Sequence, residues 1–416
     1  MREEKRIVKI SLNAEQFQPR AIAVWSLFVL WFGVTFSLAI TEIALTIALA
    51  AWLFDRVRRR NFLPLKIDWT IWGPLSVFFI LVLFSFVASE YPKQSMRGVL
   101  KIGKYLLLFM MVSDLFADRK VQKRFSLVFL FTFLIVIMDA SFQYAFGKDL
   151  LRGFILEPSG SGPRISGGFV DYSKMAAFLI LVLPMFGMLF VQAFLQKETR
   201  KHSFFMSLLV FAGLVLLFLT RSRGAMLAFI LACVLLFLYR KWFKALGITC
   251  ILLVALFFIL PKPMLIHLDA EFKEQSLIER FHLWQRAWDV IDAKPWVGTG
   301  INTYAKAHSK YDKAKSWRVR NYYAHNGYLQ LAAETGVPCL ISFLIFVLFF
   351  VRRGMKYIKS SRDKPGEYPQ LGILTGCVCF LIFALSDTVL QSPQPIVAFW
   401  FFSGLLLAYQ KTSEDS

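Results

Sequence analysis

Two arginines stand in a very short connection between apolar segments, in Thr220-Arg-Ser-Arg-Gly224. A guanidinium ion so close to hydrocarbon is costly, so it usually has a partner or a task. Because guanidinium binds phosphate oxygens in a bidentate manner, Arg221 and Arg223 could hold a diphosphate. The alternative is that both side chains extend to lipid phosphates. Residue type and spacing leave these two interpretations about even.

A third arginine, Arg280, lies in a long polar segment and is followed by Trp284 and Trp288 at intervals of four. These three residues share one face of the helix that Ser276 and Glu279 would open as a capping box. Arg280 could therefore present a cation to an anion near the membrane plane. The spacing slightly favours the alternative, an interfacial helix anchored by aromatic residues.

His325 precedes Asn326 and Gly327 at the start of another expected helix, which should end near Gly336. Imidazole titrates near neutral pH, so a histidine at this place could act as a general base. Taken alone, a histidine that only hydrogen-bonds its loop is the more common case.

Further charges recur at the expected outer boundary. Arg97, Lys101 and Lys104 form one basic stripe at helical spacing, and Arg164 precedes Asp171 at the start of another apolar segment. Each could be a cap or a packing residue. Together with Arg221 and Arg223, they could also make the boundary cationic around one pocket.

Several chemical signatures are missing from the sequence. It has no P-loop, no clustered metal-ligand set in the long polar segment and no G-x-S-x-G nucleophile motif. The five cysteines fall within or at the edge of apolar runs, which indicates neither a disulfide framework nor a zinc site. A reaction at this surface would therefore use a preactivated substrate and no cofactor.

The elements that must position these residues are membrane helices. Of the 416 residues, 57% are hydrophobic, and the mean hydropathy is +0.56. A soluble domain cannot bury that much apolar surface, so we expect an all-α polytopic membrane protein. The net charge of +21 lies in the short segments between apolar runs, which is typical of contact with lipid headgroups rather than nucleic acid.

A helix needs about 20 apolar residues to cross the hydrocarbon. That length predicts about twelve spans, near residues 21–37, 38–54, 69–88, 98–114, 125–146, 170–195, 204–219, 224–239, 243–260, 338–351, 370–388 and 394–409.

Lysine and arginine concentrate in alternate connections, which predicts that both termini are cytoplasmic. The long polar segment 261–337, between the ninth and tenth spans, would then be a large, partly helical loop facing outward, into the periplasm of a cell with two membranes. No repeat or linker divides the chain, so residues 1–416 should form a single integral membrane domain.

Three segments taken together resemble one family. They are Leu219-Thr-Arg-Ser-Arg-Gly224, the stretch from Arg280 to the PWVGTG sequence ending at Gly300, and His325-Asn-Gly-Tyr-Leu-Gln-Leu-Ala-Ala-Glu-Thr-Gly336. The pattern is similar to the O-antigen ligases and O-antigen polymerases of the bacterial envelope. His325, Asn326 and Gly336 match the family's pattern at the end of the loop, whereas Cys339 stands where a small or aromatic residue is expected. Arg223, with Arg221 second, best matches the family's arginine before the eighth span, and Arg280 best matches its loop arginine.

The resemblance implies a metal-independent, inverting ligase of the inner membrane that moves a glycan from undecaprenyl diphosphate onto lipid A-core. Arg223 and Arg280 would bind the diphosphate, His325 would orient or deprotonate the acceptor hydroxyl, and Arg97, Lys101, Lys104, Arg164, Arg221 and Asn326 would bind substrate. An O-antigen polymerase or a protein O-oligosaccharyltransferase would use a similar donor. A transporter is disfavoured because few ionisable residues, Asp139 being the clearest, lie deep within the spans.

Overall fold

The computed structural model describes residues 19–60, 68–157, 163–196, 199–244, 247, 274–311, 323–360 and 367–414. Throughout these ranges the regular structure is helical, apart from two isolated β-bridges. The helices are α1 (Pro19–Gly33), α2 (Leu38–Arg58), α3 (Trp69–Val87), α4 (Pro92–Leu115), α5 (Arg119–Phe146), the 3₁₀ turn η2 (Gly167–Phe169), α6 (Tyr172–Leu195), α7 (Arg200–Leu219), α8 (Arg223–Arg240), α11 (Glu274–Ala293), α12 (Tyr304–Tyr311), α13 (Gly327–Thr335), α14 (Val337–Ser360), α15 (Glu367–Phe383) and α16 (Pro393–Glu414).

The predicted class, a polytopic helical membrane protein, is confirmed. In the described part of the chain, seven helices are long and apolar enough to cross a membrane, namely α2, α3, α5, α6, α7, α8 and α14. Helices α1 and α15 are apolar but shorter, with 15 and 17 residues. Most of the expected ninth span, 243–260, lies outside the described residues, so the number twelve stays a prediction.

Local sequence explains several helix boundaries. Ser37 caps α2 by accepting a hydrogen bond from the Ile40 amide, which separates α2 from α1 within a nearly continuous apolar run. Helix α14 continues to Ser360 and so includes basic residues that we expected to follow the tenth span. The predicted helix start at Ser276 is wrong, because α11 begins at Glu274 and Ser276 lies inside its first turn.

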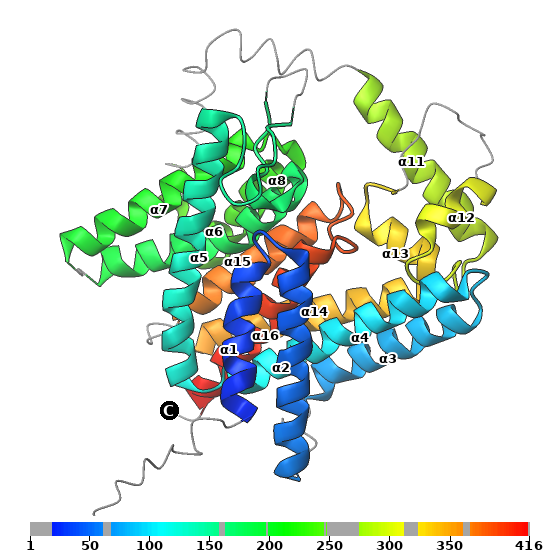
Figure 1. Cartoon of the computed structure of the whole chain (residues 1–416), viewed down its shortest axis with the longest axis horizontal. Helices are drawn as coiled ribbons and strands as arrows, with labels where there is room; N and C mark the ends of the chain where they lie inside the picture. Colours follow the sequence, from blue (N-terminus) through cyan, green and yellow to red (C-terminus); the bar gives the residue numbers. More distant parts are fainter. Residues whose placement is uncertain are drawn as a thin grey trace, which may run out of the picture.

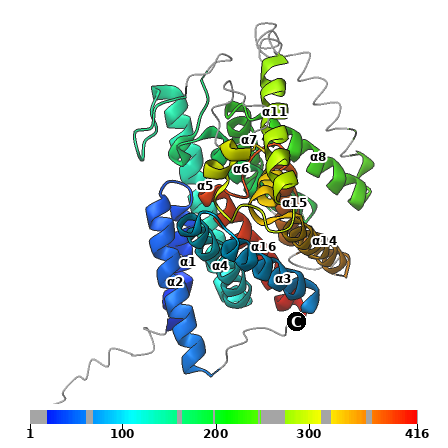
Figure 2. The same ribbon diagram turned by 90° about the vertical axis from the view of Figure 1, so that its right-hand side faces the viewer.

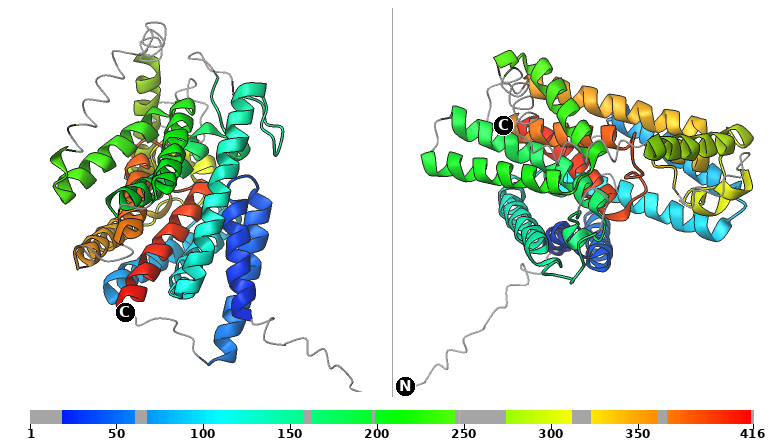
Figure 3. Two further views of the ribbon diagram at one scale, coloured as in Figure 1. Left: turned by 90° about the vertical axis from the view of Figure 1, so that its left-hand side faces the viewer. Right: turned by 90° about the horizontal axis from the view of Figure 1, so that it is seen from above.

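Closely packed helix pairs build the core. Helices α1 and α2 pack side by side, and α3 with α14, α4 with α16 and α6 with α15 form further close pairs (Figures 1 and 3). Trp31 of α1 is fully buried, and its ring stacks on Phe402 of α16 with 5.2 Å between the centroids. Buried aromatic contacts of this kind fix how the helices approach one another.

The described part of the long polar segment forms a helical group at one end of the molecule. Figures 1 and 2 show α11 near the top, away from the C-terminus, and α12 and α13 beside the ends of α3, α4 and α14. A small second core holds this group together, with Ala287, Val290 and Ile291 of α11 packed near Ala332 and Ala333 of α13. This core fixes the helix that carries Arg280 to the helix that follows His325.

Candidate functional site

Several of the candidate residues converge on the turn between α15 and α16, residues 384–392. The Gly327 amide, first in α13, donates hydrogen bonds to the carbonyl oxygens of Ala384 at 2.8 Å and Asp387 at 3.1 Å. These bonds join the start of α13 to the turn, although the two are almost 60 residues apart in the chain. His325 and Asn326, immediately before Gly327, are placed against the turn as a result.

His325 faces the carboxylate of Asp387. Its backbone is in the left-handed region, with φ of 47°, and its Nδ1 lies 3.8 Å from Asp387 Oδ1. That distance exceeds a hydrogen bond but suits an ion pair once the imidazole is protonated. Asp387 is held in turn by the Ser173 hydroxyl and by the Thr388 amide, at 2.6 Å, both of which donate to its carboxylate. The pair can therefore orient an imidazole and stabilise its positive charge.

Asn326 is the N-cap of α13. Its side-chain oxygen accepts hydrogen bonds from the Tyr328 and Leu329 amides, each at 3.1 Å. Such a cap satisfies amide groups that the first helical turn leaves without partners. In this structure Asn326 therefore fixes the helix start directly after His325.

Arg280 reaches the same turn from α11. Its Nη1 donates to the Ser386 carbonyl oxygen at 3.1 Å, one residue before Asp387. The side chain is partly buried, on a flank of α11 between the buried and exposed faces. Arg280 and His325 thus approach adjacent residues of one turn.

The connection between α7 and α8 closes on this turn as well. Gly224, the second residue of α8, lies so close to Ser386 that an added Cβ would be 2.4 Å from the serine hydroxyl oxygen. Arg223 precedes it as the first residue of α8, and Arg221 adopts a left-handed φ of 54° in the connection. The structure therefore brings the start of α8, with Arg223, to the residues that Arg280 and His325 contact.

Arg164 joins this group through α6. Its guanidinium lies over the Tyr172 ring, 4.5 Å from the centroid, and Tyr172 is next to Ser173, which binds Asp387. The Ile165 amide donates to the Leu219 carbonyl oxygen at 3.3 Å, so the segment of Arg164 also lies against the end of α7.

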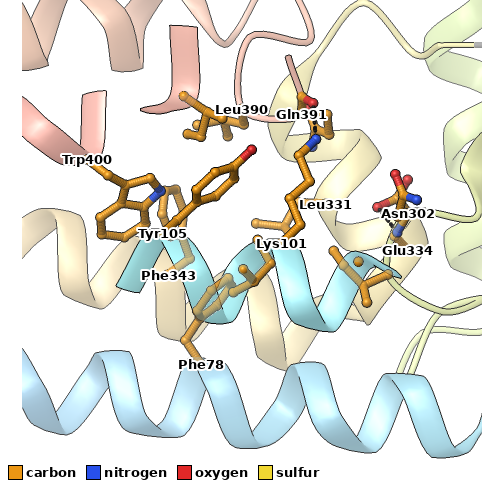
Figure 4. A pocket seen from close by; sticks show the side chains of 14 residues that line it. Phe78, Lys101, Tyr105, Asn302, Leu331, Glu334, Phe343, Leu390, Gln391 and Trp400 are labelled. Carbon is orange, nitrogen blue, oxygen red and sulfur yellow. Dashed lines mark hydrogen bonds between the residues drawn. The ribbon is translucent and has the colours of Figure 1, made fainter. Parts of the chain in front are cut away.

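The expected basic stripe on α4 is divided. Arg97 is exposed, whereas Lys104 forms an ion pair with Glu42 of α2. The Lys101 ammonium donates to the Gln391 carbonyl oxygen at 2.8 Å (Figure 4). Lys101 thus contacts the α15–α16 turn from a partly buried position, while Lys104 is joined to a different element.

The Gly298-Thr-Gly300 turn has a structural role. Its Thr299 and Gly300 amides donate to the carbonyl oxygens of Ala333 and Glu334, at 3.1 and 2.8 Å. The fully buried Glu334 carboxylate accepts hydrogen bonds from the amides of Asn302, at 2.7 Å, and Tyr304, at 3.2 Å. Burial raises the pKa of Glu334, while these hydrogen bonds oppose the rise. The turn and the end of α13 form one unit, which we call the α13 bracket (residues 298–304 and 333–336).

Sequence analysis missed Asp387, Ser173 and Glu334. Asp387 is an acidic residue in a short outward connection between two apolar segments, and that position was a usable signal. Ser173 and Glu334 carry no such signal, because their roles depend on contacts between distant segments. Among the described residues, no group of three His, Cys, Asp or Glu side chains is placed to hold a metal ion.

Fold and site together define a helical membrane protein with arginines and a histidine gathered beside one short turn. Residues 206–344 match the family model described as O-antigen ligase. The chain is also 28% identical over 191 residues to a Rickettsia felis protein with the provisional name polysaccharide ligase. That match covers 42% of this chain and 45% of the Rickettsia protein. The resemblance to O-antigen ligases is therefore confirmed for residues 206–344, which include Arg223, Arg280 and His325.

Proposed function

We propose that this protein is an O-antigen ligase, an inverting glycosyltransferase that moves a glycan from undecaprenyl diphosphate onto lipid A-core. The observation that carries the proposal is the convergence of Arg280, His325 and the α8 start on residues 386–387. The family match supports it, because the matched residues supply all three elements.

The reaction needs one nucleophile and one leaving group. The acceptor hydroxyl oxygen attacks the anomeric carbon, the bond from that carbon to the diphosphate oxygen breaks, and undecaprenyl diphosphate leaves with the bonding electrons. Attack opposite the leaving group inverts the anomeric centre. His325 takes the hydroxyl proton, and Asp387 stabilises the imidazolium that forms.

Arg223 and Arg280 bind the diphosphate and stabilise its developing charge. The donor's polyprenyl tail lies in the bilayer, so its diphosphate must lie at the membrane surface. Arg164 and Arg221 extend the cationic border around it, and the exposed Arg97 is available to a second phosphate group. Since the donor already carries a good leaving group, neither a metal ion nor a nucleotide is required.

The orientation follows from the donor and the charge pattern. We place the protein in the bacterial inner membrane with α11, α12, α13 and the α15–α16 turn on the periplasmic side, where lipid-linked glycan and lipid A-core meet. Of the described helices, α11–α13 contain no candidate span, which suits a position outside the bilayer.

A deletion strain tests the function. A ligase deletion should leave lipid A-core without attached glycan and should accumulate long glycans on undecaprenyl diphosphate. Lipid A-core that carries a single repeat unit would instead identify a polymerase. Normal lipopolysaccharide together with loss of a glycosylated protein would identify a protein O-oligosaccharyltransferase.

A further inference from the structure

Lys101 is partly buried beside a small cavity of about 50 Å³. Apolar side chains form most of the wall, including Phe78, Phe343, Leu390 and Trp400, as Figure 4 shows. An ammonium ion in such surroundings has lost part of its hydration, which is unfavourable unless partners replace the water. Its hydrogen-bond acceptor and nearby charges therefore indicate what it does.

The acceptor is the Gln391 backbone carbonyl, at 2.8 Å, in the turn that carries Asp387. The side chain of Gln391 continues the connection, because its Nε2 donates to the Gly327 carbonyl oxygen at 2.9 Å. The Gly327 amide then donates to the carbonyl oxygens of Ala384 and Asp387. One chain of hydrogen bonds thus runs from α4 to the segments that carry both members of the His325–Asp387 pair.

The charge near Lys101 also favours a structural role for this residue. Glu334 of the α13 bracket is close enough to Lys101 for the two charges to stabilise each other. Glu334 accepts hydrogen bonds from the Asn302 and Tyr304 amides and so belongs to the α13 bracket. Lys101 therefore contacts the α15–α16 turn and also lies beside the α13 bracket. Lys101 thereby connects the two structural units on either side of the candidate site.

We propose that Lys101 is a positioning residue, which acts through Gln391 and Gly327 to hold His325 and Asp387 in register and does not contact the donor diphosphate. The proposal rests on the proposed function, because the pair it positions is the pair assigned to proton transfer. A misplacement of about 1 Å in such a pair can cost about 100-fold in rate.

Lys101→Met tests the proposal, because methionine keeps an unbranched side chain and removes the ammonium. We expect kcat for glycan transfer to fall about 10- to 100-fold, while KM for the lipid-linked donor changes less than about two-fold. Gln391→Leu should reproduce the effect without removing a charge, and the double variant should be little worse than either single one. Lys411→Met, which loses a comparable hydrogen bond from a partly buried lysine of α16 to the Ser113 carbonyl oxygen of α4, at 3.4 Å, is the matched control and should retain kcat.

A large rise in donor KM with unchanged kcat in Lys101→Met would show direct donor binding and overturn the proposal. Hydrogen exchange gives a readout that does not need activity. Amides 327–331 at the start of α13 should exchange faster in Lys101→Met and Gln391→Leu, and at the wild-type rate in Lys411→Met. Unchanged exchange in the first two variants would also overturn the proposal. If the wild-type protein transfers no glycan, the proposed function fails, whereas the exchange result still reports whether Lys101 holds this site.

Discussion

At the residue scale, the proposed site depends on guanidinium geometry. Arg223 and Arg280 each offer a planar fork of donors, whereas lysine offers a point charge. We therefore expect Arg223→Lys and Arg280→Lys to lose about 100-fold or more in glycan transfer although the charge is kept. His325→Ala should lose about 100-fold in the chemical step and still bind the donor.

The variants are assayed for glycan transfer at equal amounts of folded, membrane-inserted protein. EDTA is present in the assay to test whether the reaction requires a metal ion. Arg124→Lys and Lys306→Ala, at exposed positions outside the candidate site, should transfer glycan normally. Near-normal transfer by His325→Ala, or by both Arg→Lys variants, would move the active site elsewhere.

Asp387 gives a second test at the same scale. Asp387→Asn keeps the size of the side chain but removes the charge that faces His325 Nδ1 at 3.8 Å. We expect transfer to fall about 100-fold because the imidazolium formed during proton transfer loses its counter-ion. Ser173→Ala removes one hydrogen bond to Asp387 and should cost much less. Equal activity of Asp387→Asn and the wild type would exclude the pair from the mechanism.

The sequence indicated the arginines and the histidine because their residue types are unusual at an expected membrane boundary. It could not indicate Asp387 as their companion. Asp387 acquires that role only because the Gly327 amide and the Ser173 hydroxyl bring three separate segments to one turn. The expected stripe of Arg97, Lys101 and Lys104 was correct as helical spacing. The acceptors of Lys101 and Lys104, however, lie on different elements that no local pattern specifies.

At the scale of elements, the α13 bracket depends on glycines at close backbone contacts. Gly298 has a φ of 65°, and a Cβ there would lie 2.3 Å from the Glu334 carbonyl carbon. Gly298→Ala should therefore destabilise the protein by about 1–3 kcal/mol through backbone strain alone, with further loss from the clash. Gly187→Ala in α6 is the control, since a Cβ there meets no atom within 4 Å and should be neutral or stabilising. Thermal unfolding in detergent measures both, and equal melting temperatures would contradict the assigned role of the turn.

A second element-scale contact fixes α11 and α12 to the connection between α3 and α4. Glu90 accepts hydrogen bonds from Lys294 and Lys310, each at 2.6 Å, and from the Tyr311 hydroxyl at 3.1 Å. The Lys294 hydrogen bond, followed by that of Lys310, lowers the pKa of Glu90 from 4.5 to about 2. A carboxyl group with a lowered pKa stabilises the fold above its ordinary pKa, and that contribution is lost as the pH falls towards about 2.

Hydrogen exchange in α12 should therefore increase as the pH falls from about 4.5 to about 2, after correction for intrinsic rates. Glu90→Gln should show the faster exchange already at neutral pH and should lack this acid-dependent component. If Glu90→Gln and the wild type exchange identically at neutral pH, the contact does not hold α12. Hydropathy predicted spans near α3 and α4 on one side of this contact but did not predict α12 on the other side. The contact itself joins residues more than 200 positions apart, which no local pattern specifies.

At the scale of the whole molecule, α14 relates the two sides of the membrane. It has 24 residues and is therefore about 36 Å long, more than the roughly 30 Å of hydrocarbon in a bilayer. Its first residue, Val337, donates to the Pro295 carbonyl oxygen at 2.7 Å beside the α13 bracket, while Arg352, Arg353, Lys356 and Lys359 lie in its second half. If α14 spans the bilayer, the bracket and this basic end lie on opposite sides, and the basic end should be cytoplasmic.

Single cysteines in a variant without the five native cysteines test this orientation. Lys306→Cys in α12 should react with an impermeant maleimide in intact cells, because it is exposed on the side of the bracket. Lys356→Cys in α14 and Lys120→Cys in the first turn of α5 are also exposed and should react only after lysis. Lys356→Cys and Lys120→Cys show whether the reagent leaks into intact cells. The lysed sample shows that each introduced cysteine can react. Labelling of Lys356→Cys in intact cells, with Lys306→Cys protected until lysis, would invert the topology. The proposed site would then face the cytoplasm, away from a periplasmic acceptor.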